Sequence, residues 1–368
     1  MSTINVHPAT PAQLPNILRS AYARRASLML WGPPGIGKSM IIKQFAEDNK
    51  MRFIDVRLTT LEPSDLRGLP HFDEENKRTV WYMPEFIPLV DEPTIIFLDE
   101  LTAADSRLQA SAYELVLDRQ IGGKPIPSKA WVVAAGNGAA DGAISYSMGT
   151  ALADRFQHVQ LQADVKAWLD WARNYGLHTS VLAFLKVKSE YLECNKTAIE
   201  KSEMVVPTPR SWERVSDVLR YHDQAGKEGA PSDRTTLEFD VSGYLGKQVS
   251  TEFFAVLEEI ENLPDIEKLL KAELKEQCKM VPDSITAMYG LAYSVAAYIT
   301  RKEDIRAAIN LFENLTTVTK TAVPRQEIQT LAMELIFEKA HKLKALFEIA
   351  KDPAYLKYKK KMDRFMQI

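Results

Sequence analysis

The sequence predicts an α/β fold with a parallel sheet of five strands, followed by two helical regions. Three observations support this prediction: a glycine-rich loop joins a strand-like run to a helix-like run, further apolar runs end in polar residues, and strand signals fade after Asp164. Strands that alternate with helical patterns are typical of a parallel sheet. A chain of 368 residues suits more than one domain, and we place the boundaries at residues 1–163, 164–235 and 236–368.

The composition is that of an ordinary soluble protein. Apolar residues make up 46% and charged residues 26% of the chain, with a net charge of −3. The first residues show neither a basic start nor a long apolar run, so we expect no export signal and a cytoplasmic protein that does not enter a membrane. Cys194 and Cys278 lack neighbours at metal-binding spacing, so we interpret them as ordinary thiols in a reducing compartment.

The first strand is expected near Leu28, after a leader and a helix, and it enters the loop GPPGIGKS. This loop fits the pattern G-x-x-x-x-G-K-[ST], in which glycines let backbone N–H groups wrap a phosphate chain. We expect Lys38 to reach the β- and γ-phosphates of a bound nucleotide and the Ser39 hydroxyl to bind Mg²⁺. The alternative is a chance glycine-rich turn. The predicted nucleotide contacts of the loop are Gly32, Pro33, Pro34, Gly35, Ile36, Gly37, Lys38, Ser39 and Met40.

A second strand is expected near Phe53, and the run TIIFLDE, from Thr94 to Glu100, predicts a buried third strand that ends in two acids. Open α/β sheets bind ligands at the carboxyl ends of their strands. We therefore expect Asp99 to hold Mg²⁺ through water and Glu100 to act as the general base that polarises the attacking water. The alternative is a strand that simply ends in two solvated acids.

The segment RQIGGKPIP predicts a β-hairpin that turns at Gly122 and Gly123. It precedes the strand AWVVAAGN, which ends at Asn137, and the last strand is expected near His158. We expect Asn137 to contact the γ-phosphate or the attacking water, unless it only serves the turn before Gly138.

Together these motifs resemble the AAA+ ATPases: GPPGIGKS, then IIFLDE, a hairpin, and a strand that ends in Asn. The stretches LTTLEPSDLRGLPHF and VWYMPEFIP resemble the MoxR group and its CbbQ/NorQ relatives, which carry an insert in the second helix of the core. ALADRFQHVQL and PTPRSWERVSDVL also resemble MoxR-like proteins of bacteria and phages. The resemblance covers about residues 25–220. It implies an AAA+ P-loop core, a helical lid and a helical C-terminal extension, with ATP and Mg²⁺ as cofactors.

The resemblance also assigns two arginines. Arg155, in the motif DRF, matches an arginine finger that reaches the γ-phosphate held by the neighbouring subunit; the alternative is a structural ion pair with Asp154 or Asp164. Arg210 matches a lid arginine at a helix start, which Pro209 in the first turn aims at the nucleotide. Its alternative is a solvated arginine of that first turn.

One position departs from the family pattern. Many MoxR relatives carry Asn-Arg one residue after the Asp-Glu pair, whereas this chain has Thr102 and Ala103 there. A contact between subunits that depends on that family arginine is therefore in doubt, although Arg107 lies one turn further along.

The region after Asp164 is predicted to be helical. Trp168 and Trp171 have the helical spacing of core residues, with an aromatic nucleic-acid surface as the alternative. Residues 224–236 are expected to form a flexible connector, and the apolar stretch 285–300 a buried helix, since it is shorter than a membrane span. The segment from Lys339 to the end contains nine basic and three acidic residues, which suits either a solvated helix face or a polyanion-binding tail.

These features support one main function and two alternatives. The main hypothesis is a MoxR-like ATPase that forms a ring, expected to be a hexamer. ATP hydrolysis lets the lid and the core rotate against each other, and this movement remodels a protein partner. The resemblance implies a client with a von Willebrand factor A (VWA) domain. The first alternative is a nucleic-acid motor similar to the McrB restriction ATPases, favoured by the lysine-rich end and by Arg119 and Lys124 of the hairpin. The second is a protein that uses ATP only to assemble.

Overall fold

The short apolar runs of the first half of the chain form strands, as expected for segments rich in β-branched and aromatic residues. In the computed structural model they build a parallel sheet in the order β1-β10-β2-β9-β6-β3. All five predicted strands are confirmed: β2 (Leu28–Trp31), β3 (Arg52–Arg57), β6 (Thr94–Asp99), β9 (Ala130–Gly136) and β10 (Gln157–Leu161). A sixth strand, β1 (Pro8–Ala9), pairs with β10 and was not predicted, because two residues carry no periodic signal.

The structure describes residues 5–138, 141, 146, 148–228, 233–314, 325–351, 353, 355–356 and 358–359. Contacts between residues group the chain into two units. Unit 1 comprises residues 1–168 and 193–211, and unit 2 comprises residues 169–192 and 212–368. The domain boundaries expected from the sequence stay a prediction.

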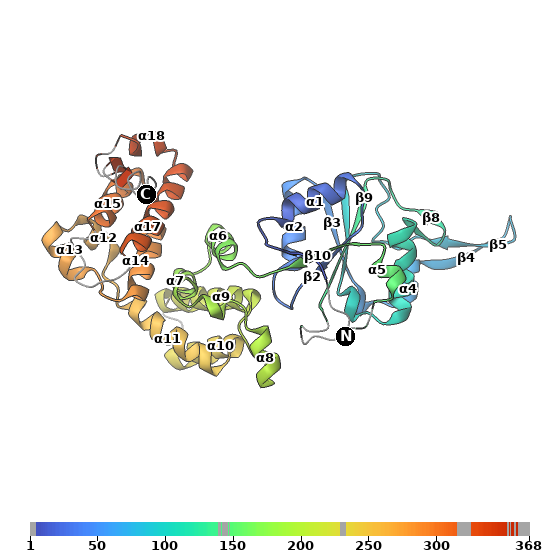
Figure 1. Ribbon diagram of the computed structural model, residues 1–368, viewed down its shortest axis with the longest axis horizontal. Helices are drawn as coiled ribbons and strands as arrows, with labels where there is room; N and C mark the ends of the chain where they lie inside the picture. The colour runs from blue at the N-terminus through green and yellow to red at the C-terminus, as the bar shows by residue number, and fades with distance from the viewer. Residues whose placement is uncertain are drawn as a thin grey trace. The chain divides into compact units, whose positions relative to one another are not determined.

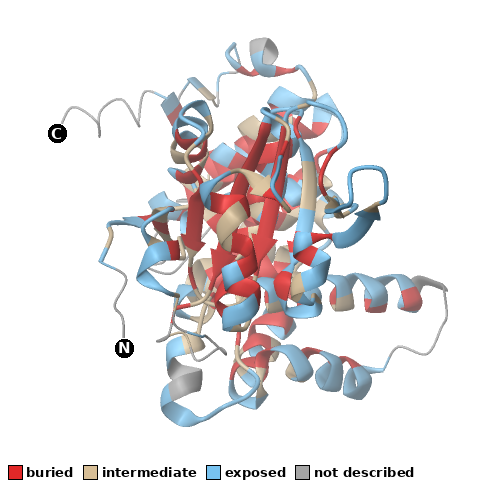
Figure 2. Cartoon of the chain, turned by 90° about the vertical axis from the view of Figure 1, so that its right-hand side faces the viewer, coloured by how far each residue is buried: buried red, intermediate tan, exposed pale blue. Residues whose placement is uncertain are grey.

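The sheet of unit 1 is covered on both faces (Figure 1). The helices α1 (Leu14–Ala23) and α2 (Lys38–Asp48) pack on one face, and α4 (Ser106–Leu117) packs on the other. Side chains of β6 alternate between the two cores, with Phe97 on the α2 side and Leu98 on the α4 side. Figure 2 shows the buried strands as a red layer between these helices.

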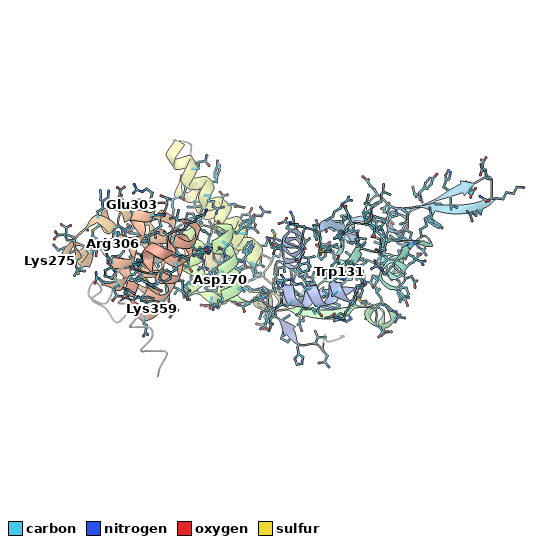
Figure 3. All side chains as sticks on the ribbon, turned by 90° about the horizontal axis from the view of Figure 1, so that it is seen from above. Trp131, Asp170, Lys275, Glu303, Arg306 and Lys359 are labelled. Atoms are coloured by element: carbon cyan, nitrogen blue, oxygen red, sulfur yellow. The ribbon has the colours of Figure 1, made fainter. Side chains whose placement is uncertain are left out.

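The deep position of Trp131 illustrates this packing. It lies within the α/β unit, where Figure 3 labels it, and it is fully buried. Its indole Nε1 donates a hydrogen bond of 2.8 Å to the carbonyl of Ala26, so its one polar group has a partner. The strand β9 is thereby fixed to the turn that leads into β2.

Two hairpins extend from unit 1. The predicted hairpin is confirmed: β7 (Gln120–Ile121) and β8 (Lys124–Pro125) are joined by Gly122 and Gly123, whose φ angles of 54° and 71° favour glycine. A second hairpin, β4 (Leu69–Asp73) and β5 (Arg78–Tyr82), follows α3 (Pro63–Arg67) and projects from the unit (Figure 1). A Cβ on Gly122 would lie 2.6 Å from Cβ of Trp81, so the two hairpins pack closely at this point.

Unit 2 is helical, as predicted, and aromatic residues form part of its core. Phe184, Trp212 and Phe253 are fully buried, with ring centroids 5.2 to 5.6 Å apart, and Tyr191 stacks on Phe184. The helices that lie wholly in it are α7 (Thr179–Val187), α10 (Arg234–Leu245), α11 (Lys247–Glu261), α12 (Ile266–Lys271), α13 (Leu274–Met280), α14 (Ile285–Tyr298), α15 (Lys302–Glu313), α17 (Arg325–Lys342) and α18 (Leu346–Ile349). Two helices begin in unit 1 and continue into unit 2: α6 (Val165–Tyr175) and α9 (Pro209–Glu228).

Some of the predictions for the second half of the chain are confirmed, and one is wrong. The apolar stretch 285–300 is confirmed as a buried helix, α14, and Trp168 is buried as a core residue should be. The flexible connector is wrong at both ends, since α9 continues to Glu228 and α10 begins at Arg234; packing overrides the glycine and charge signals there. The lysine-rich end lies partly outside the described residues, including Lys357, Lys360, Lys361 and Arg364. Within the described part of the chain, no helix combines the length and apolarity needed to cross a bilayer.

Candidate functional site

The predicted phosphate-binding loop leads from β2 into α2. Gly35 and Gly37 have φ angles of 76° and 98°, which only glycine adopts without strain. A Cβ on Gly35 would lie 2.8 Å from Oγ1 of Thr208, and Nδ2 of Asn195 donates to the carbonyl of Pro34 at 3.2 Å. Both partners belong to residues 193–211 of unit 1, so this segment packs directly on the loop.

Lys38 begins α2 and is 9% exposed. Its Nζ donates to the carbonyls of Gly32 at 2.6 Å and Pro33 at 3.1 Å, and to Oδ1 of Asn137 at 2.8 Å. Burial lowers the pKa of Lys38 to about 8, although the nearby Asp99 charge acts in the opposite direction. An anion close to the ammonium would favour its charged form and raise this pKa again.

Ser39 and Asp99 lie together, as the sequence predicted for a magnesium site. The Ser39 hydroxyl donates to Oδ2 of Asp99 at 2.8 Å, and Asp99 is 7% exposed. A hydroxyl and a carboxylate at the carboxyl end of a strand are the hard oxygen ligands that Mg²⁺ takes alongside phosphate and water. Among the described residues, no three His, Cys, Asp or Glu side chains are grouped to hold a metal.

Glu100 follows Asp99 in a left-handed conformation with φ of 58°. Such a backbone is uncommon for a residue other than glycine and is often found at functional sites. The Glu100 N–H donates to Oδ1 of Asp99 at 2.9 Å, and the Thr59 hydroxyl donates to the Glu100 carboxylate. Thr59 lies in the 3₁₀ turn after β3, Leu58–Thr60, so the two residues meet across neighbouring strands.

Asp55 of β3 is a further acid on this side of the sheet. Burial raises its pKa, and the charge of Asp99 adds to this effect. No local pattern marks Asp55, because it lies inside a strand and not at its end.

Asn137 directly follows β9 and joins the loop through Lys38. Its backbone is held by Thr102. The Asn137 N–H donates to the Thr102 hydroxyl at 3.0 Å, and the same hydroxyl donates to the Asn137 carbonyl at 3.2 Å. The structure therefore brings Lys38, Ser39, Asp99, Glu100 and Asn137 together at one edge of the sheet, as predicted.

Arg155 follows the short helix α5 (Thr150–Ala153) and is exposed. It forms an ion pair of 2.5 Å with Asp154, which is one of the two partners expected for the structural alternative. The turn that carries it is linked to the loop strand: Trp31 Nε1 donates to Nδ1 of His158 at 2.8 Å, and Nε2 of His158 lies 2.8 Å from the Ala153 carbonyl. Because Nδ1 accepts this bond, the imidazole proton lies on Nε2, which donates to the Ala153 carbonyl.

Arg210 lies in the first turn of α9 and is exposed, with Pro209 as the first residue of the helix, as expected. Its charge is close enough to Lys38 to contribute to the lowering of the lysine pKa. Arg210 thus shares the electrostatic surroundings of the loop, although it comes from a distant part of the sequence. Met40, the third residue of α2, is also exposed.

Sequence reasoning missed Thr59, Asp55 and Asn195, and it noted Thr102 only as a departure from a family pattern. Each acts through a partner that lies far away in the sequence, so no local spacing marks it. For Thr59 a signal was available, since it follows the strand beside TIIFLDE and parallel strands end at the same edge.

Comparison with known families matches residues 28–160 to the model described as "ATPase family associated with various cellular activities (AAA)". Two curated relatives are peroxisomal ATPases: PEX6 of Dictyostelium discoideum, 28% identical, and pex6 of Schizosaccharomyces pombe, 29% identical, each over 112 residues. The match covers 30% of this chain but only 9% and 11% of those proteins.

Among solved structures, the RuvB Holliday junction branch migration motor of Thermotoga maritima is similar over 77% of this chain and 80% of RuvB. The sequence identity is 15% and the TM-score is 0.37. At this TM-score the superposition supports no conclusion about function.

Proposed function

We propose that the chain hydrolyses ATP with Mg²⁺ as its cofactor and works as a ring that remodels a protein partner; the match of residues 28–160 to the AAA ATPase family model supports the ATPase part. The observation that carries the proposal is the hydrogen-bonded cluster at the sheet edge. Lys38 contacts Asn137 there, and Ser39 contacts Asp99. These bonds join the phosphate-binding loop to the ends of β9 and β6, which carry the residues proposed to act at the γ-phosphate.

The side chains of the cluster have distinct tasks in this proposal. Lys38 and the loop N–H groups bind the phosphates, and Ser39 and Asp99 hold Mg²⁺, which supplies positive charge to the transferred phosphoryl group. Glu100 takes the proton of the attacking water, and Asn137 orients that water or the γ-phosphate. The left-handed backbone of Glu100 and its bond to Thr59 hold the carboxylate in place.

Arg155 acts in the neighbouring subunit in this proposal. Its guanidinium is exposed and forms its ion pair with the adjacent Asp154, so a neighbour's phosphate can compete with Asp154 for it. An arginine supplied in this way offsets charge that develops in the transition state. Each site then needs residues from two neighbouring subunits. Repetition of this contact gives a ring, which we propose to be a hexamer. Hydrolysis then alters the contacts of the loop with residues 193–211, to which Arg210 belongs.

The client is proposed to be a protein, and a VWA-domain protein is the first candidate because of the MoxR-like motifs. The nucleic-acid alternative rests on Arg119, Lys124 and the lysine-rich end, which lies partly outside the described residues. Arg119 of the predicted hairpin donates to the carbonyls of Pro127, Ser128 and Ala130, so its guanidinium serves the fold of the hairpin.

The test combines two inactive variants. Glu100→Gln and Arg155→Ala are each expected to lower the ATPase rate at least about 100-fold, since general bases and arginine fingers contribute that much or more. When the two variants are mixed, part of the activity should return, because some interfaces pair an intact Glu100 with an intact Arg155. Glu47→Gln, an exposed residue of α2, is the matched control and should leave the rate unchanged.

Three outcomes would contradict the proposal. A wild-type rate of ATP turnover no higher than that of Glu100→Gln contradicts the role of Glu100 as general base. A mixture that stays inactive shows that Arg155 does not act between subunits. A particle mass that stays that of one protomer with a slowly hydrolysed ATP analogue, measured by mass photometry, excludes the ring.

A further inference from the structure

We infer that Thr102 is a positioning residue: its hydroxyl holds the backbone of Asn137, and through it sets the place of the Asn137 side chain beside Lys38. This inference rests on the proposed function, because it assigns Asn137 a part in ATP hydrolysis. The observation behind it is a pair of hydrogen bonds. The Asn137 N–H donates to Oγ1 of Thr102 at 3.0 Å, and Oγ1 donates to the Asn137 carbonyl at 3.2 Å.

A hydroxyl suits this double contact because it is both a donor and an acceptor on one atom. Thr102 is 1% exposed, so water does not compete for either bond. The bonds act on the peptide groups on both sides of the Asn137 Cα. They restrict its φ and ψ angles, and thereby the direction in which the side chain leaves the backbone.

Gly136 allows Thr102 to come this close. A Cβ on Gly136 would lie 2.7 Å from both Cγ2 and Oγ1 of Thr102, and 2.7 Å from Cε of Met29. Real Cβ atoms do not approach so closely, and two of these three atoms belong to Thr102. Glycine is therefore required at position 136, the last residue of β9, because the Thr102 side chain approaches its backbone so closely.

The element that carries Thr102 is itself fixed. It is the 3₁₀ turn η2 (Leu101–Ala103), which directly follows Glu100. The Gln109 side chain of α4 donates to the carbonyls of Leu101 at 3.4 Å and Ala104 at 3.1 Å, and the Thr102 carbonyl accepts from the Tyr146 N–H at 2.6 Å. One short turn thus links the position of the proposed base, Glu100, to that of Asn137.

The consequence is a specific kinetic effect. Lys38 and the loop bind the phosphates without help from Thr102, so nucleotide affinity should depend little on it. The alignment of Asn137 matters for the reacting groups, so the turnover rate should depend on it strongly. A residue that merely filled space would affect stability, with no preference for kcat over KM.

The experiment compares Thr102→Val with Thr102→Ser in the full chain. Val keeps the shape but lacks the hydroxyl, and it is expected to lower kcat about tenfold while KM for ATP changes less than about twofold. Ser keeps the hydroxyl and should retain most of the wild-type kcat. Asn137→Ala lowers kcat by itself, and adding Thr102→Val to it should lower kcat no further, because the two residues act in series.

Each other outcome overturns the inference: a Thr102→Val enzyme with wild-type kcat, a Thr102→Ser enzyme as slow as Thr102→Val, or effects of Thr102→Val and Asn137→Ala that multiply. If Thr102→Val does not fold, Gly136→Ala replaces it. Its added methyl displaces the Thr102 side chain, so kcat should fall in the same way, and an unchanged kcat contradicts the inference. A wild-type protein without ATPase activity would instead refute the proposed function.

Discussion

The sheet edge of unit 1 and the aromatic core of unit 2 are stabilised by different forces. At the sheet edge, polar groups such as Lys38, Asp99 and Asn137 are buried or half-buried and are held by directional hydrogen bonds. In unit 2, the rings of Phe184, Trp212 and Phe253 pack against one another and are fully buried. A substitution at the sheet edge should therefore change the ATPase rate, whereas one in the aromatic core should change stability.

The largest expected effect on stability comes from Phe253→Ala. Removal of a fully buried aromatic ring leaves a cavity between Phe184 and Trp212 and should lower the free energy of unfolding by about 3–5 kcal/mol. Urea unfolding followed by tryptophan fluorescence measures this loss. Phe239→Ala is the matched control, because Phe239 is 74% exposed and its loss should change stability by less than about 0.5 kcal/mol.

The distinction between the two regions is contradicted if Phe253→Ala lowers the ATPase rate at a temperature where the variant is still folded. In that case the aromatic core takes part in the chemistry. A loss of stability no greater than that of the Phe239 control would show that the rings do not pack as described.

An intermediate effect is expected from pH at the sheet edge. The buried Lys38 has a pKa of about 8 in the free protein, and a bound triphosphate raises it, so binding takes up a proton above this pH. Nucleotide affinity should therefore fall as the pH rises through 8, by about tenfold between pH 7 and pH 9. Calorimetric titrations in buffers of different ionisation enthalpy measure both the affinity and the proton uptake.

Lys38→Arg is the matched control for this measurement. Its guanidinium stays charged throughout this range, so its affinity, whatever its level, should not vary between pH 7 and pH 9. A wild-type affinity that is equally constant would mean that Lys38 keeps its ordinary pKa and that burial does not act on it.

The smallest effect concerns a polar bond inside unit 2. The Tyr191 hydroxyl donates to the Glu252 carboxylate at 2.6 Å, and this bond is the first cause of the lowered pKa of Glu252. Tyr191→Phe should lower the free energy of unfolding by about 1 kcal/mol at pH 7 without a change in ATPase rate. Thermal unfolding of both proteins across a pH series measures the difference.

The sign of the pH dependence follows from the lowered pKa. The bond favours the ionised carboxylate, so its contribution is present above the ordinary pKa of a glutamate and is lost as the pH falls through the lowered value. Wild type and Tyr191→Phe should therefore become equally stable in acid. Tyr221→Phe is the control, because Tyr221 is 64% exposed. If this control loses as much free energy of unfolding as Tyr191→Phe, the bond between Tyr191 and Glu252 contributes nothing.

The two regions also differ in how far the sequence predicted them. The strands β2, β6 and β9 and the loop were predicted because their signals are local: short apolar runs, glycines at fixed spacing, and acids at a strand end. In unit 2 the helices were expected, but the two ends of the connector predicted at residues 224–236 are helical. Glycine and charge weaken a helix only slightly, and tertiary packing decides whether it continues.

The α/β fold of unit 1 and the main members of the candidate site follow from the sequence, since parallel strands end at one edge and bring together Lys38, Ser39, Asp99, Glu100 and Asn137. The residues that hold these side chains in place are visible only in the folded structure. Thr59 and Glu100 are 41 positions apart, Thr102 and Asn137 are 35 apart, and Trp31 and His158 are 127 apart. Hydrogen bonds act over about 3 Å of space whatever the separation along the chain, so such partners become visible only when the fold has placed them.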